Sequence, residues 1–171
     1  GRMGVLAEVI VNISTLPEID DVYGFFFPSW ERAVCAVQTI AGSDIPISMI
    51  RLSNPSETMT NLALAGNERQ TAFLSHYLRF RGISEEKSCM CLVGFTGSRR
   101  VTTSARRAVF SIIRRDKGVC LGKPMGKAWK KNRFQSAYLR NTLWDLGYAV
   151  DTLETAGVEA LGDLASQRRR V

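Results

Sequence analysis

Hydrophobic and polar positions along the chain alternate in segments that switch between a period of two residues and a period near 3.6. A period of two with β-branched or aromatic residues predicts a strand, and a period near 3.6 predicts a helix. The segments with strand character are 5–13, 23–27, 47–52, 88–95, 118–121 and 148–155. The segments with helical character are 30–41, 55–64, 71–81, 101–115, 127–134, 138–143 and 158–169.

Several of these predicted elements have residues at their ends that favour a boundary. Pro28 ends the aromatic strand, and Ser29 then provides an N-cap for the helix that Gly42 ends. Ser53 or Asn54 is able to cap the helix that begins at Pro55.

The order strand, helix, strand, helix occurs twice, which suggests a duplicated unit. It predicts an α+β domain with a mainly antiparallel sheet and helices on one face, as in ferredoxin-like folds. The length of 171 residues, with 45% hydrophobic residues, suits one globular domain with a substantial core.

Composition changes this picture in three ways. The net charge of +7 is compatible with phosphate, nucleic acid or an acidic partner surface, and by itself selects none of them. The four cysteines lack CxxC spacing and are predicted to be buried thiols, with the pair at 89 and 91 on one strand face. No apolar run approaches the ~20 residues that span a bilayer, so no transmembrane segment is expected.

Two arginines are candidate binding residues. Arg51 ends an apolar strand, where it either points to solvent or binds an anion such as a carboxylate or phosphate. Arg140 lies among aromatic and apolar residues, where it either packs its stem on Trp144 or serves as an anion clamp. The segment 101–115 predicts an amphipathic helix with a basic solvent side.

Catalytic machinery is not expected within this chain. His76 is the only histidine, so neither a catalytic triad nor a histidine-rich metal site can form, and no metal is predicted. Asp151 and Glu154 lie three apart on a predicted strand, hence on opposite faces. Gly1 and Gly4 precede a predicted strand, where they form either a tight turn or a close backbone approach to a phosphate or flat ring.

Three segments carry a family resemblance. Gly1-Arg2-Met3-Gly4-Val5-Leu6-Ala7-Glu8 resembles the segment that ends the FAD-binding domain in flavoproteins of the vanillyl-alcohol-oxidase type. Pro46-Ile47-Ser48-Met49-Ile50-Arg51-Leu52 resembles a segment of the alkyldihydroxyacetonephosphate synthases. The stretch from Gly122 to Ala156 is similar to bacterial FAD-linked oxidases related to those synthases. After Ala156, Gly157 and Val158 stand where the family has proline and tryptophan.

The resemblance implies a fragment of an FAD-dependent enzyme. Residues 1–18 would end the FAD-binding domain, and 19–171 would form most of a substrate-binding cap domain, incomplete at its C-terminus. The residues that would line the FAD are Gly1, Arg2, Met3, Gly4, Val5 and Leu6. Arg51 and Arg140 would be substrate-binding residues: Arg51 would help shape the active site, and Arg140 would hold the acidic part of an anionic, small-molecule or lipid-like substrate that the cap positions against the flavin N5. A fragment that lacks the pyrophosphate loops and the catalytic residues would be inactive alone.

The resemblance also leaves alternatives. The enzyme would be an ether-lipid synthase or an FAD-dependent 2-hydroxy-acid dehydrogenase, a homodimer by family habit, and cytoplasmic in bacteria or peroxisomal if it is a eukaryotic synthase. A different class is a basic nucleic-acid-binding module, because the aromatic strand 23–27 faintly resembles the base-stacking strand of RNA-recognition domains. The basic pattern of that motif is absent, so nucleic-acid binding is the less favoured interpretation.

Overall fold

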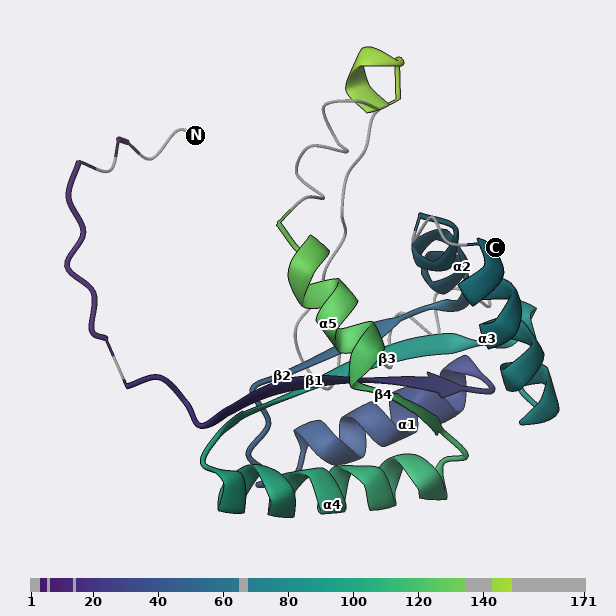
Figure 1. The fold of residues 1–171 in the computed structure, drawn as a ribbon, viewed down its shortest axis with the longest axis horizontal. Helices are drawn as coiled ribbons and strands as arrows, with labels where there is room; N and C mark the ends of the chain where they lie inside the picture. The colour runs from purple at the N-terminus through teal and green to yellow at the C-terminus, as the bar shows by residue number, and fades with distance from the viewer. Residues whose placement is uncertain (1–3, 6, 14, 65–67, 135–142, 149–171) are drawn as a thin grey trace.

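The computed structural model describes residues 4–5, 7–13, 15–64, 68–134 and 143–148 (Figure 1). Its elements, in chain order, are β1 (Ile19–Phe27), α1 (Trp30–Ala41), β2 (Met49–Ser53), α2 (Pro55–Leu64), α3 (Glu68–Phe80), a 3-10 turn η1 (Glu85–Lys87), β3 (Cys89–Gly97), α4 (Arg99–Arg115), β4 (Val119–Gly122) and α5 (Lys123–Asn132).

The four strands form one antiparallel sheet in the order β2-β3-β1-β4. β3 lies between the two strands that α1 connects, and β1 lies between the two strands that α4 connects. This interlocking of two strand-helix-strand units is the split arrangement of ferredoxin-like folds. The predicted α+β class and duplicated unit are therefore confirmed.

The lower face of the sheet in Figure 1 carries α1 and α4 and forms the larger core. Odd-numbered residues of β1 and β3 point into it because side chains alternate across a strand. Their fully buried members are Phe25, Phe27, Cys89, Cys91 and Val93. The helices contribute small and branched residues, among them Ala33, Ala36, Ala105, Val109 and Ile113.

Helices also cover the opposite face of the sheet, whereas the sequence predicted helices on one face. A second cluster contains Phe26, Met90 and Val119 from the strands, with Leu78 of α3 and Ile83. Leu62 of α2 and Met125 of α5 pack against it. Phe26 points to this face because it is one residue out of phase with Phe25 and Phe27.

The predicted caps are present at the helix starts. Ser29 Oγ accepts a hydrogen bond from the Arg32 amide at 3.5 Å. Asn54 Oδ1 accepts from the Glu57 amide at 2.9 Å, which selects Asn54 over Ser53 as the cap of α2. Both helices lie where the sequence predicts them.

Residues 5–13 are the main error of the sequence prediction. The described residues of this segment form no strand, and Val5, Ile10 and Ile13 are more than nine-tenths exposed. Alternating side chains create a strand only where a second strand supplies hydrogen-bond partners, and no described strand lies beside this segment. Three further elements are predicted at 138–143, 148–155 and 158–169. Apart from residues 143 and 148, they lie outside the described residues.

The cysteine prediction holds for two of the four residues. Cys89 and Cys91 are buried on one face of β3, whereas Cys35 and Cys120 are exposed. Cys35 lies on the outer side of α1, and side-chain type alone does not specify which side of a helix faces the sheet. Among the described residues, no helix combines the length and apolarity needed to cross a bilayer.

Candidate functional site

Arg51 lies on β2, which is an edge strand of the sheet. Its neighbours Ile50 and Leu52 pack against the larger core, so the Arg51 side chain is directed to the opposite face, where α2 lies. Its side chain is 41% exposed. The structure thus places this guanidinium at a partly open position on the sheet.

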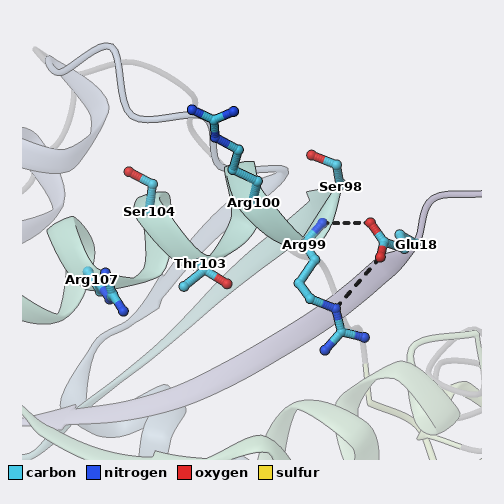
Figure 2. Close-up of a pocket in the computed structure, with 7 residues that line it drawn as sticks. All are labelled: Glu18, Ser98, Arg99, Arg100, Thr103, Ser104 and Arg107. Carbon is cyan, nitrogen blue, oxygen red and sulfur yellow. Dashed lines mark hydrogen bonds and ion pairs between the residues drawn. The ribbon is translucent and has the colours of Figure 1, made fainter.

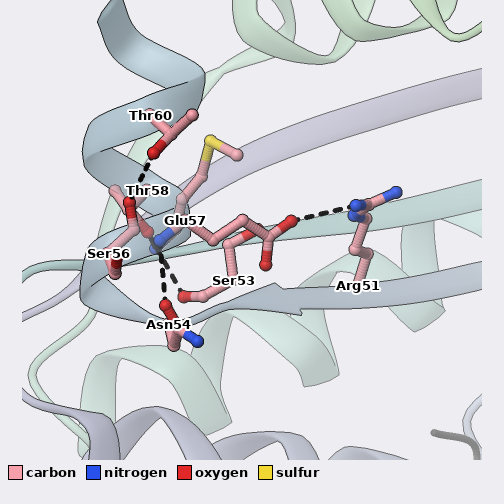
Figure 3. A network of polar contacts seen from close by, with 8 residues as sticks. Arg51, Ser53, Asn54, Ser56, Glu57, Thr58 and Thr60 are labelled. Atoms are coloured by element: carbon pink, nitrogen blue, oxygen red, sulfur yellow. Dashed lines mark hydrogen bonds and ion pairs between the residues drawn. The ribbon is translucent and has the colours of Figure 1, made fainter. Parts of the chain in front are cut away.

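The guanidinium of Arg51 already holds a carboxylate of its own chain. Its Nη2 donates to Oε1 of Glu57 at 2.9 Å (Figure 3). Glu57 stands at the third position of α2, where the Asn54 cap fixes the backbone. Arg51 is therefore paired within its own chain while partly exposed, and its binding of an external anion stays a prediction.

The helix that carries Glu57 is anchored to the sheet by a buried hydroxyl. Thr58 Oγ1 donates to the Ser53 carbonyl at 3.3 Å and accepts from the Met90 amide at 3.0 Å. Thr58 is fully buried, so these bonds lie away from water. Nearby, Ser53 Oγ is buried without a hydrogen-bond partner in the described structure. The start of α2, and with it Glu57, is therefore fixed relative to β2 and β3.

Two lysine-aspartate pairs attach α5 to β1. Lys130 Nζ lies 2.5 Å from Asp20 Oδ2, and Lys123 Nζ lies 2.7 Å from Asp21 Oδ2. The hydrogen bond from Lys130 lowers the pKa of the Asp20 carboxyl, while that to Asp21 raises the pKa of Lys123. This helix leads into the segment that contains Arg140.

Most of the residues that the resemblance assigns to FAD and substrate lie outside the described part of the chain, namely Gly1, Arg2, Met3, Leu6 and Arg140. Gly4 has φ of +134°, with no atom within 4 Å of where a Cβ would stand. Val5 beside it is 96% exposed. The described residues do not enclose a flavin site here, so the assignment of this segment to FAD stays a prediction.

The aromatic strand does not form a platform for stacking bases. Phe25, Phe26 and Phe27 have no exposed surface, and Tyr23 is 7% exposed. Tyr23 and Phe25 instead make edge-to-face contacts with Phe110 of α4, with ring centroids 5.4 and 5.2 Å apart. Base stacking needs exposed rings, so the structure removes the main argument for the nucleic-acid alternative.

Sequence reasoning did not identify Glu57 as the partner of Arg51, or the pairing of Asp20 with Lys130. The Asn54-Pro55 boundary predicts an acidic residue in the first turn of α2, which is a weak signal for Glu57. Asp20 and Lys130 lie 110 positions apart, and no local pattern connects them. His76 is an exposed residue of α3, where the sequence analysis placed it in a helix.

The chain matches the sequence model of the family "FAD linked oxidases, C-terminal domain" over residues 16–167. It is 32% identical over 161 residues to the alkyldihydroxyacetonephosphate synthase of Dictyostelium discoideum, a match that covers 91% of this chain and 26% of that protein. The corresponding protein of Trypanosoma brucei brucei is 26% identical over 162 residues, again with 91% of this chain and 26% of the relative covered.

A solved structure of alkyldihydroxyacetonephosphate synthase superimposes with a TM-score of 0.66 at 32% sequence identity. The match covers 76% of this chain and 24% of the solved one. The chain thus spans about a quarter of the length of the curated relatives it matches.

Proposed function

Because the chain belongs to the family of FAD linked oxidases, C-terminal domain, we propose that it is the substrate-binding cap portion of an FAD-dependent enzyme. Residues 1–18 end the FAD-binding domain in this proposal, and the cap domain begins at residue 19, where β1 starts. Bound FAD supplies the reactive ring, and the protein's part is to hold the substrate against it.

The observation that carries the proposal is the carboxylate held by Arg51. A planar guanidinium that is 41% exposed and binds Glu57 has the geometry to exchange this partner for a substrate carboxylate or phosphate. Arg140 is proposed as the second anion-binding residue, and Gly1 to Leu6 as the part that lines the FAD.

The proposed substrate is an acidic or phosphate-bearing, lipid-like molecule. The relatives named alkyldihydroxyacetonephosphate synthase support a phosphate, and an FAD-dependent 2-hydroxy-acid dehydrogenase is the alternative because its substrate carries a carboxylate. Catalytic residues are assigned to other parts of the enzyme, so this chain is expected to be inactive alone. A homodimer and a cytoplasmic or peroxisomal location belong to the same proposal.

The first experiment compares visible absorbance of the enzyme that contains this chain with that of the 171-residue chain after incubation with FAD and desalting. Flavin bands kept by the enzyme and lost from the chain are the expected result. An enzyme that folds without flavin would overturn the assignment.

The second experiment tests the role of Arg51 in the same enzyme. Arg51→Lys keeps the charge and removes the planar fork, so we expect KM for the anionic substrate to rise more than kcat falls. Arg79→Lys, at an exposed position on α3, is the matched control. An unchanged KM in Arg51→Lys would show that Arg51 does not bind the substrate.

A further inference from the structure

The six arginines of α4 fall into two sets. Three have partners inside the chain: Arg99 pairs with Glu18, Arg106 donates to the Tyr23 hydroxyl at 2.8 Å, and Arg115 pairs with Asp116 at 3.2 Å. α4 contains no acidic residue, so none of these charges is balanced within the helix. Contacts within the chain therefore give a partner to three of the six arginines of α4.

The other three are Arg100, Arg107 and Arg114, which we call the arginine stripe. Residues seven apart lie on nearly the same side of a helix, about 10.5 Å apart along its axis, so the stripe is about 21 Å long. All three are exposed, on the side of α4 opposite the buried Thr102, Ala105, Val109 and Ile113. In the described part of the chain, no carboxylate pairs with them.

Helix stability does not explain the stripe. Arg100 stands in the first turn, where the positive end of the helix dipole disfavours a cation. Arg114, in the last turn, is the only member that this dipole favours. Three exposed arginines on one side of the helix give that side a positive potential that attracts an external anion.

The surface between the arginines suits anionic side chains. Ser104 lies between Arg100 and Arg107, and Ser111 lies between Arg107 and Arg114, so the stripe alternates arginine and serine. A hollow of about 610 Å³ at the start of α4 is lined by Ser98, Thr103 and Ser104, by three arginines and by the carboxylate of Glu18 (Figure 2). A second, of about 260 Å³, is lined by Phe110, Ser111 and three arginines. Each hollow offers a hydroxyl beside guanidinium groups.

A carboxylate of the same chain lies beside the stripe. At the first hollow, Glu18 Oε2 accepts a hydrogen bond from the Arg99 amide at 2.8 Å, and Oε1 lies 3.6 Å from Arg99 Nε (Figure 2). Glu18 is the residue just before β1. This carboxylate is bound by Arg99, which lies beside the stripe and is not a member of it.

We propose that the arginine stripe is a docking surface for an acidic segment of a partner protein, with carboxylates that recur about every 10.5 Å, as on a helix with glutamates seven residues apart. The basic surface is one helix wide, because the neighbouring exposed charges of α1 are Glu31 and Arg32, of opposite sign. A linear segment matches this shape, whereas a membrane presents a plane. The nearest ring, Phe110, is partly buried against Tyr23 and Phe25.

The test measures fluorescence anisotropy of a labelled helical peptide that carries three glutamates at intervals of seven residues, with a Glu→Gln peptide as the uncharged probe. The protein variant is R100Q/R107Q/R114Q. The control variant is R79Q/R81Q/K87Q, which removes the same charge from exposed positions off α4. Circular dichroism establishes that both variants are folded.

We expect the stripe variant to bind the acidic peptide about tenfold more weakly than the unmodified chain, since three exposed ion pairs contribute roughly that factor together. The control variant should bind as the unmodified chain does, and the Gln peptide should bind the unmodified chain about tenfold more weakly than the acidic peptide does, because it lacks the same three ion pairs. Equal loss in both variants would overturn the proposal, as would no binding by the unmodified chain. Stripe-dependent binding that is tighter to phosphatidylserine vesicles or to a single-stranded oligonucleotide would also overturn it, in favour of lipid or nucleic acid.

Discussion

The α-carbon of Gly126 in α5 lies directly against the carbonyl oxygen of Val22 in β1, and a Cβ at position 126 would clash with that oxygen. On the same strand, a Cβ at Gly24 would stand 2.6 Å from the Met125 sulfur. The helix therefore rests on the strand at a distance that only glycine permits, and Lys123 and Lys130 attach it on either side.

Gly126→Ala should therefore destabilise the chain. Alanine is normally the better helix residue by about 1 kcal/mol, whereas a backbone clash of this size costs about 1–3 kcal/mol. We expect a net decrease in the free energy of unfolding, measured by chemical denaturation. Lys127→Ala on the exposed side of α5 is the control and should change it by less than about 0.5 kcal/mol. A gain in stability for Gly126→Ala would show that α5 does not pack this closely.

Thr58→Val should cost about 1–3 kcal/mol of unfolding free energy, because the buried Met90 amide loses its acceptor while the side-chain volume stays similar. Ser53→Ala at the neighbouring position should be close to neutral, because Ser53 Oγ has no hydrogen-bond partner in the described structure. Denaturant titration of both variants checks the contrast. Equal costs would contradict the assigned roles of the two hydroxyls.

Thiol labelling should separate the four cysteines. Burial raises the pKa of Cys89 and of Cys91 to about 12, so neither forms the reactive thiolate near neutral pH in the folded chain. Cys35 is exposed and should react first with a disulfide reagent, and Cys120 should follow more slowly because partial burial raises its pKa. Cys35→Ser should remove the fastest phase. Rapid labelling of all four thiols without denaturant would contradict the burial of β3.

The Asp20 pair predicts a loss of stability in acid. The hydrogen bond from Lys130 lowers the folded-state pKa of Asp20 below its ordinary value of 3.8. The pair therefore contributes stability above that value, and the contribution is lost as the pH falls through the lowered pKa. Because Asp20 is half-exposed, the contribution is at most about 1 kcal/mol.

The measurement compares unfolding free energies of the unmodified chain and Asp20→Asn from about pH 2 to about pH 6. The two curves should converge at the acid end, because protonated Asp20 is then as uncharged as asparagine. A constant separation across this range would exclude Asp20 as a contributor to the acid response.

Local sequence pattern predicted where helices and strands lie better than it predicted which strands pair with one another. Asn54 and Pro55 specify where α2 begins, because a cap and a proline act on the residues next to them. The same alternation that predicts β1 also predicts a strand at 5–13, which is exposed and unpaired among the described residues. Alternation reports a suitable side-chain order, but a strand also needs a partner.

The candidate site shows the same division. The sequence singles out Arg51 as an arginine in an apolar strand, but the helix boundary at Asn54-Pro55 is only a weak signal for Glu57 and does not indicate that its carboxylate binds Arg51 at 2.9 Å. Likewise, the helical period of α4 predicts a basic outer side, but does not tell Arg106, which donates to Tyr23, from Arg107, which belongs to the arginine stripe.

Helix ends, strand character and the family of this chain follow from neighbouring residues, since capping, periodicity and motif spacing are local properties. The order of the strands, the burial of Cys89 but not Cys35, and the contact of Gly126 with Val22 depend on segments far apart in the sequence. These features are set when the two faces of the sheet are covered, because only then does each side chain acquire its partners or remain in water.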